Sequence, residues 1–149
     1  MRDADVKELA TALRHPDCKF RGPLDLSENK ELTDQSALYI ADVLKKIDGT
    51  SNISKLNLSK TSMESKAGLF IGEALLSNPH YSIEKLTFKG VNIEDNGLYR
   101  LLEAANANKN IKNLHLGKIS DYGLRAMADL LKQNNTLVKL EFSESKETS

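Results

Sequence analysis

The chain has 149 residues, of which 40% are hydrophobic and 28% are charged, and its 21 basic residues balance 21 acidic ones. This is the composition of one ordinary globular domain, and it excludes a disordered chain. The zero net charge, the absence of Trp and the presence of only four Phe and four Tyr argue against a nucleic-acid partner. No apolar run reaches the roughly 18 residues of a membrane span, so we expect no membrane partner.

Two further features predict a cytoplasmic protein. Residues 1–5 lack the basic and then apolar pattern of a secretory signal. The one cysteine, Cys18, has no second cysteine in the chain for a disulfide, which agrees with a reducing compartment. We expect no cofactor, because the pair Gly117-Lys118 lacks the upstream glycine and the following Ser or Thr of a phosphate-binding loop.

The first element predicted in chain order is a helix over residues 4–14. Its apolar stripe follows helical spacing and consists of Val6, Leu9, Ala10 and Leu13. The pair His15-Pro16 ends the stripe, because the residue before proline is disfavoured in a helix. We expect this helix to be either the last helix of a half repeat or a cap over the first strand.

Five short strand-like segments follow, and most carry an apolar residue, two others, a leucine, a variable residue and another Leu or Phe. They cover residues 22–26, 53–58, 83–88, 111–116 and 137–142. Their central leucines stand 32, 30, 28 and 26 residues apart and are Leu24, Leu56, Leu86, Leu114 and Leu140. A helical segment rich in Leu and Ala fills each interval. Recurrence at such a period predicts a stacked repeat array.

The third unit shows the plan of a repeat most clearly. Leu86 and Phe88 alternate with polar residues, as in a strand with one buried face. Turn residues follow, and then apolar residues at helical spacing over residues 98–105. We expect asparagines to end this helix, because Asn tolerates the left-handed cap conformation; they are Asn106, Asn108 and Asn110.

This plan of strand, turn, helix and return resembles the leucine-rich repeats of the ribonuclease-inhibitor type over roughly residues 20–143. Residues 128–137 look particularly like the repeats of the C-terminal domain of tropomodulin. The resemblance implies an α/β solenoid, a right-handed βα superhelix with about five short parallel strands on its concave face and helices on its convex face. We expect a single repeat domain over residues 1–143, followed by a polar tail over residues 144–149.

Two departures from the family pattern lead to further expectations. The position that usually holds an Asn on the inner turn reads Asn29, Thr61, Val91, Ile119 and Ser145. We therefore expect the hydrogen-bond ladder of this turn to be interrupted after the first repeat. Pro23 interrupts the first strand and lacks a backbone donor, so this strand is predicted to lie at the edge of the sheet.

The variable residues of the strands predict an open binding face. The candidate binding residues on it are Lys55, Asn57, Lys85, Thr87, Lys89, Asn113, His115, Lys139 and Glu141. Lys55, Lys85 and Lys89 form a cluster that could receive an acidic peptide, or could simply keep the face soluble. His115 has neither a second metal ligand nor a nucleophile beside it, so we predict no metal site, no catalytic residue and no enzymatic activity.

The function predicted from the sequence is an intracellular scaffold for protein–protein interaction with an unidentified protein partner. Alternatives are an actin-associated capping-type protein, like tropomodulin, and a bacterial effector with eukaryotic-like repeats. Activation of a GTPase, as in the related Ran-activating proteins, is disfavoured because Arg100 and Arg125 fall within predicted helices. The last strand precedes a polar tail instead of a helix, so a homodimer through this edge and a fragment of a longer repeat protein both remain open.

Overall fold

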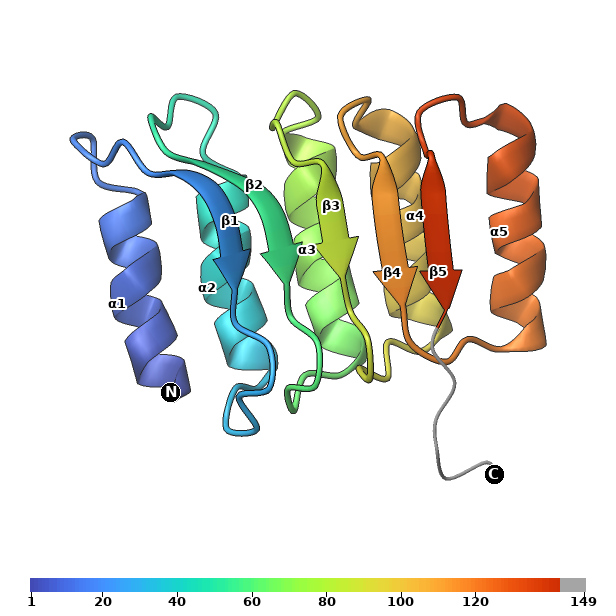
Figure 1. The fold of residues 1–149 in the computed structure, drawn as a ribbon, viewed down its shortest axis with the longest axis horizontal. Coiled ribbons are helices and arrows are strands. Elements are labelled where there is room, and N and C mark those ends of the chain that lie inside the picture. The colour runs from blue at the N-terminus through green and yellow to red at the C-terminus, as the bar shows by residue number, and fades with distance from the viewer. Residues whose placement is uncertain (143–149) are drawn as a thin grey trace.

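The computed structural model describes residues 1–142, in which five helices alternate with five strands. The strands form one layer and the helices stand behind them in a second layer (Figure 1). The helices are α1 (Asp3–Leu13), α2 (Asp34–Leu44), α3 (Ser65–Ser77), α4 (Asp95–Ala107) and α5 (Asp121–Gln133). The strands are β1 (Arg21–Asp25), β2 (Asn52–Asn57), β3 (Lys85–Thr87), β4 (Asn113–Leu116) and β5 (Lys139–Phe142). The fold is the leucine-rich-repeat solenoid that the sequence predicted, with α1 matching the helix expected over residues 4–14.

The strands pair in parallel in the order β1-β2-β3-β4-β5, so that neighbours in sequence are neighbours in space. The predicted leucine column is confirmed, because its members are direct register partners across the sheet: Leu24, Leu56, Leu86, Leu114 and Leu140. β1 and β2 are as long as the predicted segments but begin one residue earlier, whereas β3, β4 and β5 are shorter, and β3 has only three residues. Ile83, which opens the predicted third segment, lies before the strand but is fully buried. The apolar pattern therefore marks core residues beyond the hydrogen-bonded ladder.

The first strand carries the irregularity that its proline predicted. β1 lies at one edge of the sheet, and its register against β2 shifts between Gly22 and Pro23. Proline cannot donate to a ladder, which confines it to edge strands and bulges. The structure therefore confirms the expected edge position.

The core lies between the two layers and runs through the array. Leu56 and Leu86 from the strands are at most 1% exposed, and Ile71 and Leu101 from the helices are fully buried. Helices α3 and α4 approach especially closely, since a Cβ added to Gly68 would lie 2.9 Å from the Cα of Gly97. Each repeat thus buries its apolar side against its neighbours.

Asparagines at the helix ends form a polar ladder between repeats, which we call the asparagine ladder. The Nδ2 atoms of Asn78, Asn108 and Asn134 donate to the carbonyls of Leu44, Tyr81 and Ala105 in the preceding repeat, at 2.9, 2.9 and 3.3 Å. The predicted left-handed cap is wrong, because Asn108 has a φ of −90° and an extended backbone. These residues end their helices because their side chains satisfy carbonyls about 30 residues back in the chain.

A second set of contacts, here the aspartate ladder, joins the starts of the helices. Asp3 Oδ1 accepts a hydrogen bond of 3.0 Å from the backbone N–H of Thr33, which caps α2. Asp34 in turn accepts from the backbone of Glu64 at 2.7 Å, and Asp95 accepts from the Ser120 hydroxyl at 2.7 Å. A carboxylate in the first turn of α1, α2 and α4 therefore orders the start of the next helix, whereas α3 has no acidic residue in its first turn.

The backbone of the inner turn makes more hydrogen bonds than the sequence suggested. Asn29 donates to the carbonyls of Leu26 and Ser27, as the family pattern implies. Thr61 makes a similar bond through its hydroxyl, to the Leu58 carbonyl at 2.9 Å. At the next position the backbone itself closes the turn, since Val91 N–H donates to the Phe88 carbonyl. The predicted interruption therefore begins one repeat later, while Ser145 and the polar tail lie outside the described residues.

Candidate functional site

The sheet register gathers the predicted binding residues into two straight rows, which together we call the strand face. The first row contains Lys55, Lys85, Asn113 and Lys139, and the second contains Asn57, Thr87, His115 and Glu141. Lys89 lies two residues beyond the end of β3 and belongs to the following loop. Because adjacent strands are about 4.8 Å apart, residues within a row are close neighbours.

The strand face has a charge-paired half on β4 and β5. His115 Nδ1 lies 3.9 Å from Glu141 Oε2, and Lys139 Nζ lies 3.4 Å from Glu141 Oε1. Partial burial lowers the pKa of His115, the charge of Glu141 opposes that shift, and nearby lysines add to it. A hydrogen bond from Lys139 lowers the pKa of Glu141 below its ordinary value, and the charges of Lys139 and His115 add to this effect. This half therefore carries a carboxylate already matched to cations.

The other half of the strand face is basic. Lys55 and Lys85 are register partners on β2 and β3, and within residues 1–142 neither ammonium group has a carboxylate within 4 Å. Asn57 lies in the adjacent row, but its Oδ1 accepts a hydrogen bond of 3.0 Å from the Ser59 backbone. Its side chain thus holds the turn that follows β2. The basic pair is the part of this face with unmatched charge.

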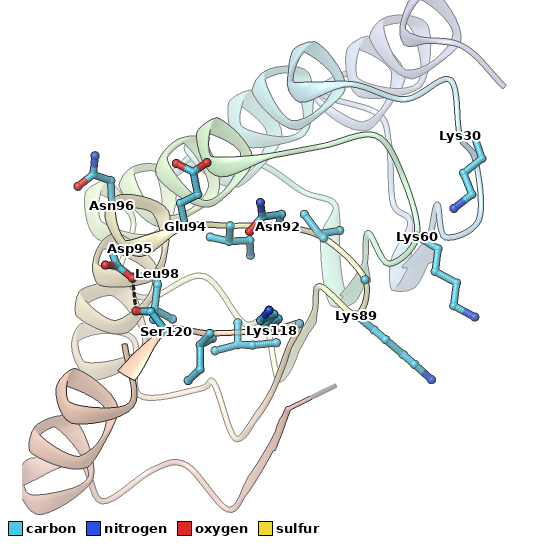
Figure 2. A pocket seen from close by; sticks show the side chains of 16 residues that line it. Lys30, Lys60, Lys89, Asn92, Glu94, Asp95, Asn96, Leu98, Lys118 and Ser120 are labelled. Carbon is cyan, nitrogen blue, oxygen red and sulfur yellow. Dashed lines mark hydrogen bonds between the residues drawn. The ribbon is translucent and has the colours of Figure 1, made fainter. Parts of the chain in front are cut away.

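A groove that the sequence analysis did not predict lies where the strands lead into the helices. It has a volume of about 1200 Å³ and is open to solvent; we call it the loop groove (Figure 2). Four lysines from successive strand-to-helix loops line it, and they form the lysine row: Lys30, Lys60, Lys89 and Lys118. They stand six, four, three and four residues beyond the central leucine of their repeat, so they share no single repeat position in the sequence. Only Lys89 was among the predicted binding residues.

The backbone of these loops is unusual at corresponding positions. Glu28 and Lys60 adopt left-handed conformations with φ of 63° and 55°, and Gly90 has a φ of 73°. A residue other than glycine rarely adopts this region, because its Cβ crowds the backbone. The stacking of the loops holds it there, since Glu28 N–H donates to the Ser59 carbonyl and Lys60 N–H to the Lys89 carbonyl.

Two kinds of site are absent from the described residues. No group of three or more His, Cys, Asp or Glu side chains in residues 1–142 is arranged to hold a metal ion. No helix in the same range has the length and apolarity needed to cross a membrane.

Comparison with known proteins supports the fold and gives it a wider context. No family model matches the chain. The chain is 29% identical over 139 residues to human NACHT, LRR and PYD domains-containing protein 13, and 27% identical over 135 residues to mouse protein 4C of the same description. These alignments cover 92% and 89% of the chain but only 13% of each relative. The chain therefore matches a small part of long proteins named for leucine-rich repeats.

A solved structure has the same fold at low sequence identity. Leiomodin-1 Actin-Binding Site 2 superposes with a TM-score of 0.74 over 93% of this chain and 77% of the other. The two sequences are 18% identical. This likeness shows a shared leucine-rich-repeat architecture.

Proposed function

We propose that the chain is a cytoplasmic protein-interaction module of the ribonuclease-inhibitor type, without enzymatic activity, that binds a protein partner through its strand face. The observation that carries the proposal is the alignment of polar residues in two rows on a parallel sheet. Two further observations support it: helices alternate with the strands along the array, and the similar proteins are named for leucine-rich repeats. Repeat solenoids provide extended surfaces for this purpose.

The basic half of the strand face defines the chemistry of the partner. Lys55 and Lys85 are unmatched by carboxylates in the described chain, whereas Lys139 is already paired with Glu141. A partner that brings a carboxylate to the β2–β3 half gains favourable charge contacts there without displacing an existing ion pair. The β4–β5 half offers the side-chain amide of Asn113 as a hydrogen-bonding group, and Thr87 on the neighbouring β3 adds its hydroxyl.

Affinity capture with the whole chain tests this function. Proteins retained by the wild type are compared with those retained by Lys55→Glu/Lys85→Glu and by the control Lys7→Glu/Lys66→Glu, which reverses two exposed lysines on helices α1 and α3, in the layer behind the sheet. We expect the first variant to lose the partner, by at least tenfold in affinity, and the control to keep it. Equal retention by both variants contradicts binding through the strand face.

A second candidate is a cytoskeletal role, favoured by the fold shared with Leiomodin-1 Actin-Binding Site 2. We propose actin as the partner to test first. Cosedimentation with filaments and binding to monomeric actin measure it directly, with the Lys55→Glu/Lys85→Glu variant beside the wild type. If neither form of actin binds at micromolar concentration, this candidate is rejected while the general interaction function stands.

A homodimer through β5 is a further proposal about partners. β5 ends the described sheet, and Val138 and Phe142 beside this edge are 81% and 41% exposed. An unpaired edge with exposed apolar side chains favours strand pairing with another chain. Light scattering across a concentration series should show a dimer that Val138→Lys weakens, and a constant monomer mass contradicts the dimer.

A further inference from the structure

We propose that the loop groove is a second binding surface, which receives an extended acidic segment of a partner protein along the lysine row. This surface differs from the strand face and its binding does not depend on the function proposed above. Figure 2 shows Lys30, Lys60 and Lys89 projecting from neighbouring loops on one side of the groove, with Glu94 and Asn96 on the helix side. Lys118 is drawn nearer the middle of the groove, so three of the four lysines share one side and the fourth lies between that side and the helices.

The charge of the lysine row is unmatched within the described chain. None of its four ammonium groups lies within 4 Å of a carboxylate in residues 1–142, although several other lysines do. Lys45, Lys132 and Lys139 each have an acidic neighbour at 3.4–3.7 Å. The chain as a whole has equal numbers of basic and acidic residues. The lysine row is therefore a local arrangement that leaves four cations free to bind external carboxylates.

The spacing of the loops fits an extended peptide. Successive loops follow strands that lie about 4.8 Å apart, so four loops span about 15 Å. About five residues of extended chain, at about 3.3 Å each, cover this distance. The apolar residues that line the groove are Val91, Ile93, Leu98, Leu116 and Ile119; the first four are at most 5% exposed, and Ile119 is partly exposed. A segment that alternates acidic with apolar residues can direct its carboxylates to the lysines, while Ile119 offers an apolar contact to its other side chains.

The loops are held in place before any partner arrives. Lys60 N–H donates to the Lys89 carbonyl at 2.8 Å, and a Cβ added to Gly117 would lie 2.9 Å from the Val91 carbonyl oxygen. Lys60 keeps a left-handed backbone that glycine would adopt without strain. A lysine at such a position adds a charge at a cost in backbone strain, which agrees with a binding role.

The groove fits a protein segment better than a nucleic acid. Within residues 1–142 no aromatic or Arg side chain lines it, so bases would find no stacking surface there. The helix side also carries Glu94 and Asp95, which would repel the continuous phosphate chain of a nucleic acid. A short acidic peptide needs only the lysine row and can avoid these two carboxylates.

The test uses the whole chain and a fluorescent eight-residue peptide that alternates Glu with Leu, with a Gln-for-Glu peptide and a single-stranded oligonucleotide as competing probes. The variant Lys30→Gln/Lys60→Asn/Lys118→Gln removes three charges and leaves Lys89 in place. The matched control Lys7→Gln/Lys19→Gln/Lys112→Gln removes three exposed lysines outside the groove. Binding is measured by fluorescence anisotropy at two salt concentrations, and folding of each protein by circular dichroism.

We expect the groove variant to bind the Glu peptide about tenfold more weakly than wild type, and the control to bind it within twofold. The Gln peptide should bind at least tenfold more weakly than the Glu peptide. Added salt should lower the affinity for the Glu peptide but not the affinity for the Gln peptide. Lys60→Gly alone should bind the Glu peptide more weakly yet unfold at a higher temperature. Equal losses in the two triple variants, or tighter binding of the oligonucleotide than of the Glu peptide, overturn the proposal.

Discussion

The two ends of the array treat their apolar residues differently. At the α1 end, Val6 and Leu13 are 0% and 6% exposed, and the outer side of α1 presents charged and small residues. At the α5 end, Leu124 and Leu131 are each 48% exposed and Val138 of the neighbouring β5 segment is 81% exposed. The outer side of α1 is therefore mainly polar, although Met1 and Phe20 near it are 53% and 40% exposed, whereas the outer side of α5 and the β5 segment present several exposed apolar residues.

Polar contacts between neighbouring helices, in contrast, are present at both the α1 end and the α5 end. Asp3 fastens α1 to the start of α2, and Asp95 accepts from Ser120 at the start of α5. The asparagine ladder also reaches α5 through Asn134. The comparison teaches that hydrogen bonds fix the register of every repeat, while the burial of apolar residues decides how stable each end is.

The largest expected difference comes from matched leucine substitutions at the two ends. Leu13→Ala should lower the free energy of unfolding by about 2–3 kcal/mol, because it leaves a cavity under α1. Leu131→Ala, at a half-exposed site, should lower it by less than about 0.5 kcal/mol. Urea unfolding followed by circular dichroism measures both. Similar losses would mean that α5 is covered as fully as α1.

The asparagine ladder should weaken from the interior toward the α5 end. Asn108 is fully buried, and its side chain serves the Tyr81 carbonyl and the Asn110 N–H. Asn108→Ala should cost about 2 kcal/mol, because both backbone groups lose their partner away from water. Asn134→Ala should cost about 1 kcal/mol, since water can reach its half-buried site. Chemical unfolding measures the loss in the free energy of unfolding for both variants. A larger loss for Asn134→Ala than for Asn108→Ala would contradict this prediction.

The polar fastening of the α1 end depends on the charge of Asp3. Burial raises the pKa of Asp3, but hydrogen bonds from Ser36 and Thr33 outweigh it and bring the pKa below its ordinary value of 3.8. Its contribution to stability is therefore complete above pH 3.8 and is lost as the pH falls through the lower folded value. Asp3→Asn should cost about 1 kcal/mol at pH 7. The difference from wild type should shrink below pH 3, and a constant difference contradicts this account.

The smallest expected effect reports on the position of β5. His115 on β4 has a pKa below 6.5 because burial disfavours its charged form, and Glu141 on β5 partly opposes that shift. Folding stability from this group is therefore present above pH 6.5 and declines as the pH falls through the lower folded pKa. Glu141→Gln should lower the pKa of His115 further, as measured by NMR titration. An unchanged titration would mean that β5 does not hold its carboxylate beside His115.

Local periodicity predicted much of the fold and part of the candidate site. Alternation in residues 83–88 placed Leu86 and Phe88 inward, and the same period of two placed Thr87 and its counterparts in one row. The lysine row was missed because its members stand in loops, where no fixed period predicts which way a side chain points. The sequence predicted that Asn108 ends its helix through a left-handed backbone. The actual reason is a side-chain hydrogen bond to the Tyr81 carbonyl, which is 27 residues away in the chain and therefore not visible in a local pattern.

The sequence by itself determined the repeat, the inward leucine column and the rows of the strand face, since these follow from the geometry of a single strand or helix. Only the tertiary structure decided which side chains reach across repeats, which lysines share a groove and which leucines of α5 stay exposed. These properties depend on how neighbouring repeats stack, and stacking brings together residues about 30 positions apart. Asp3 beside Thr33 and Lys60 beside Lys89 are joined in this way.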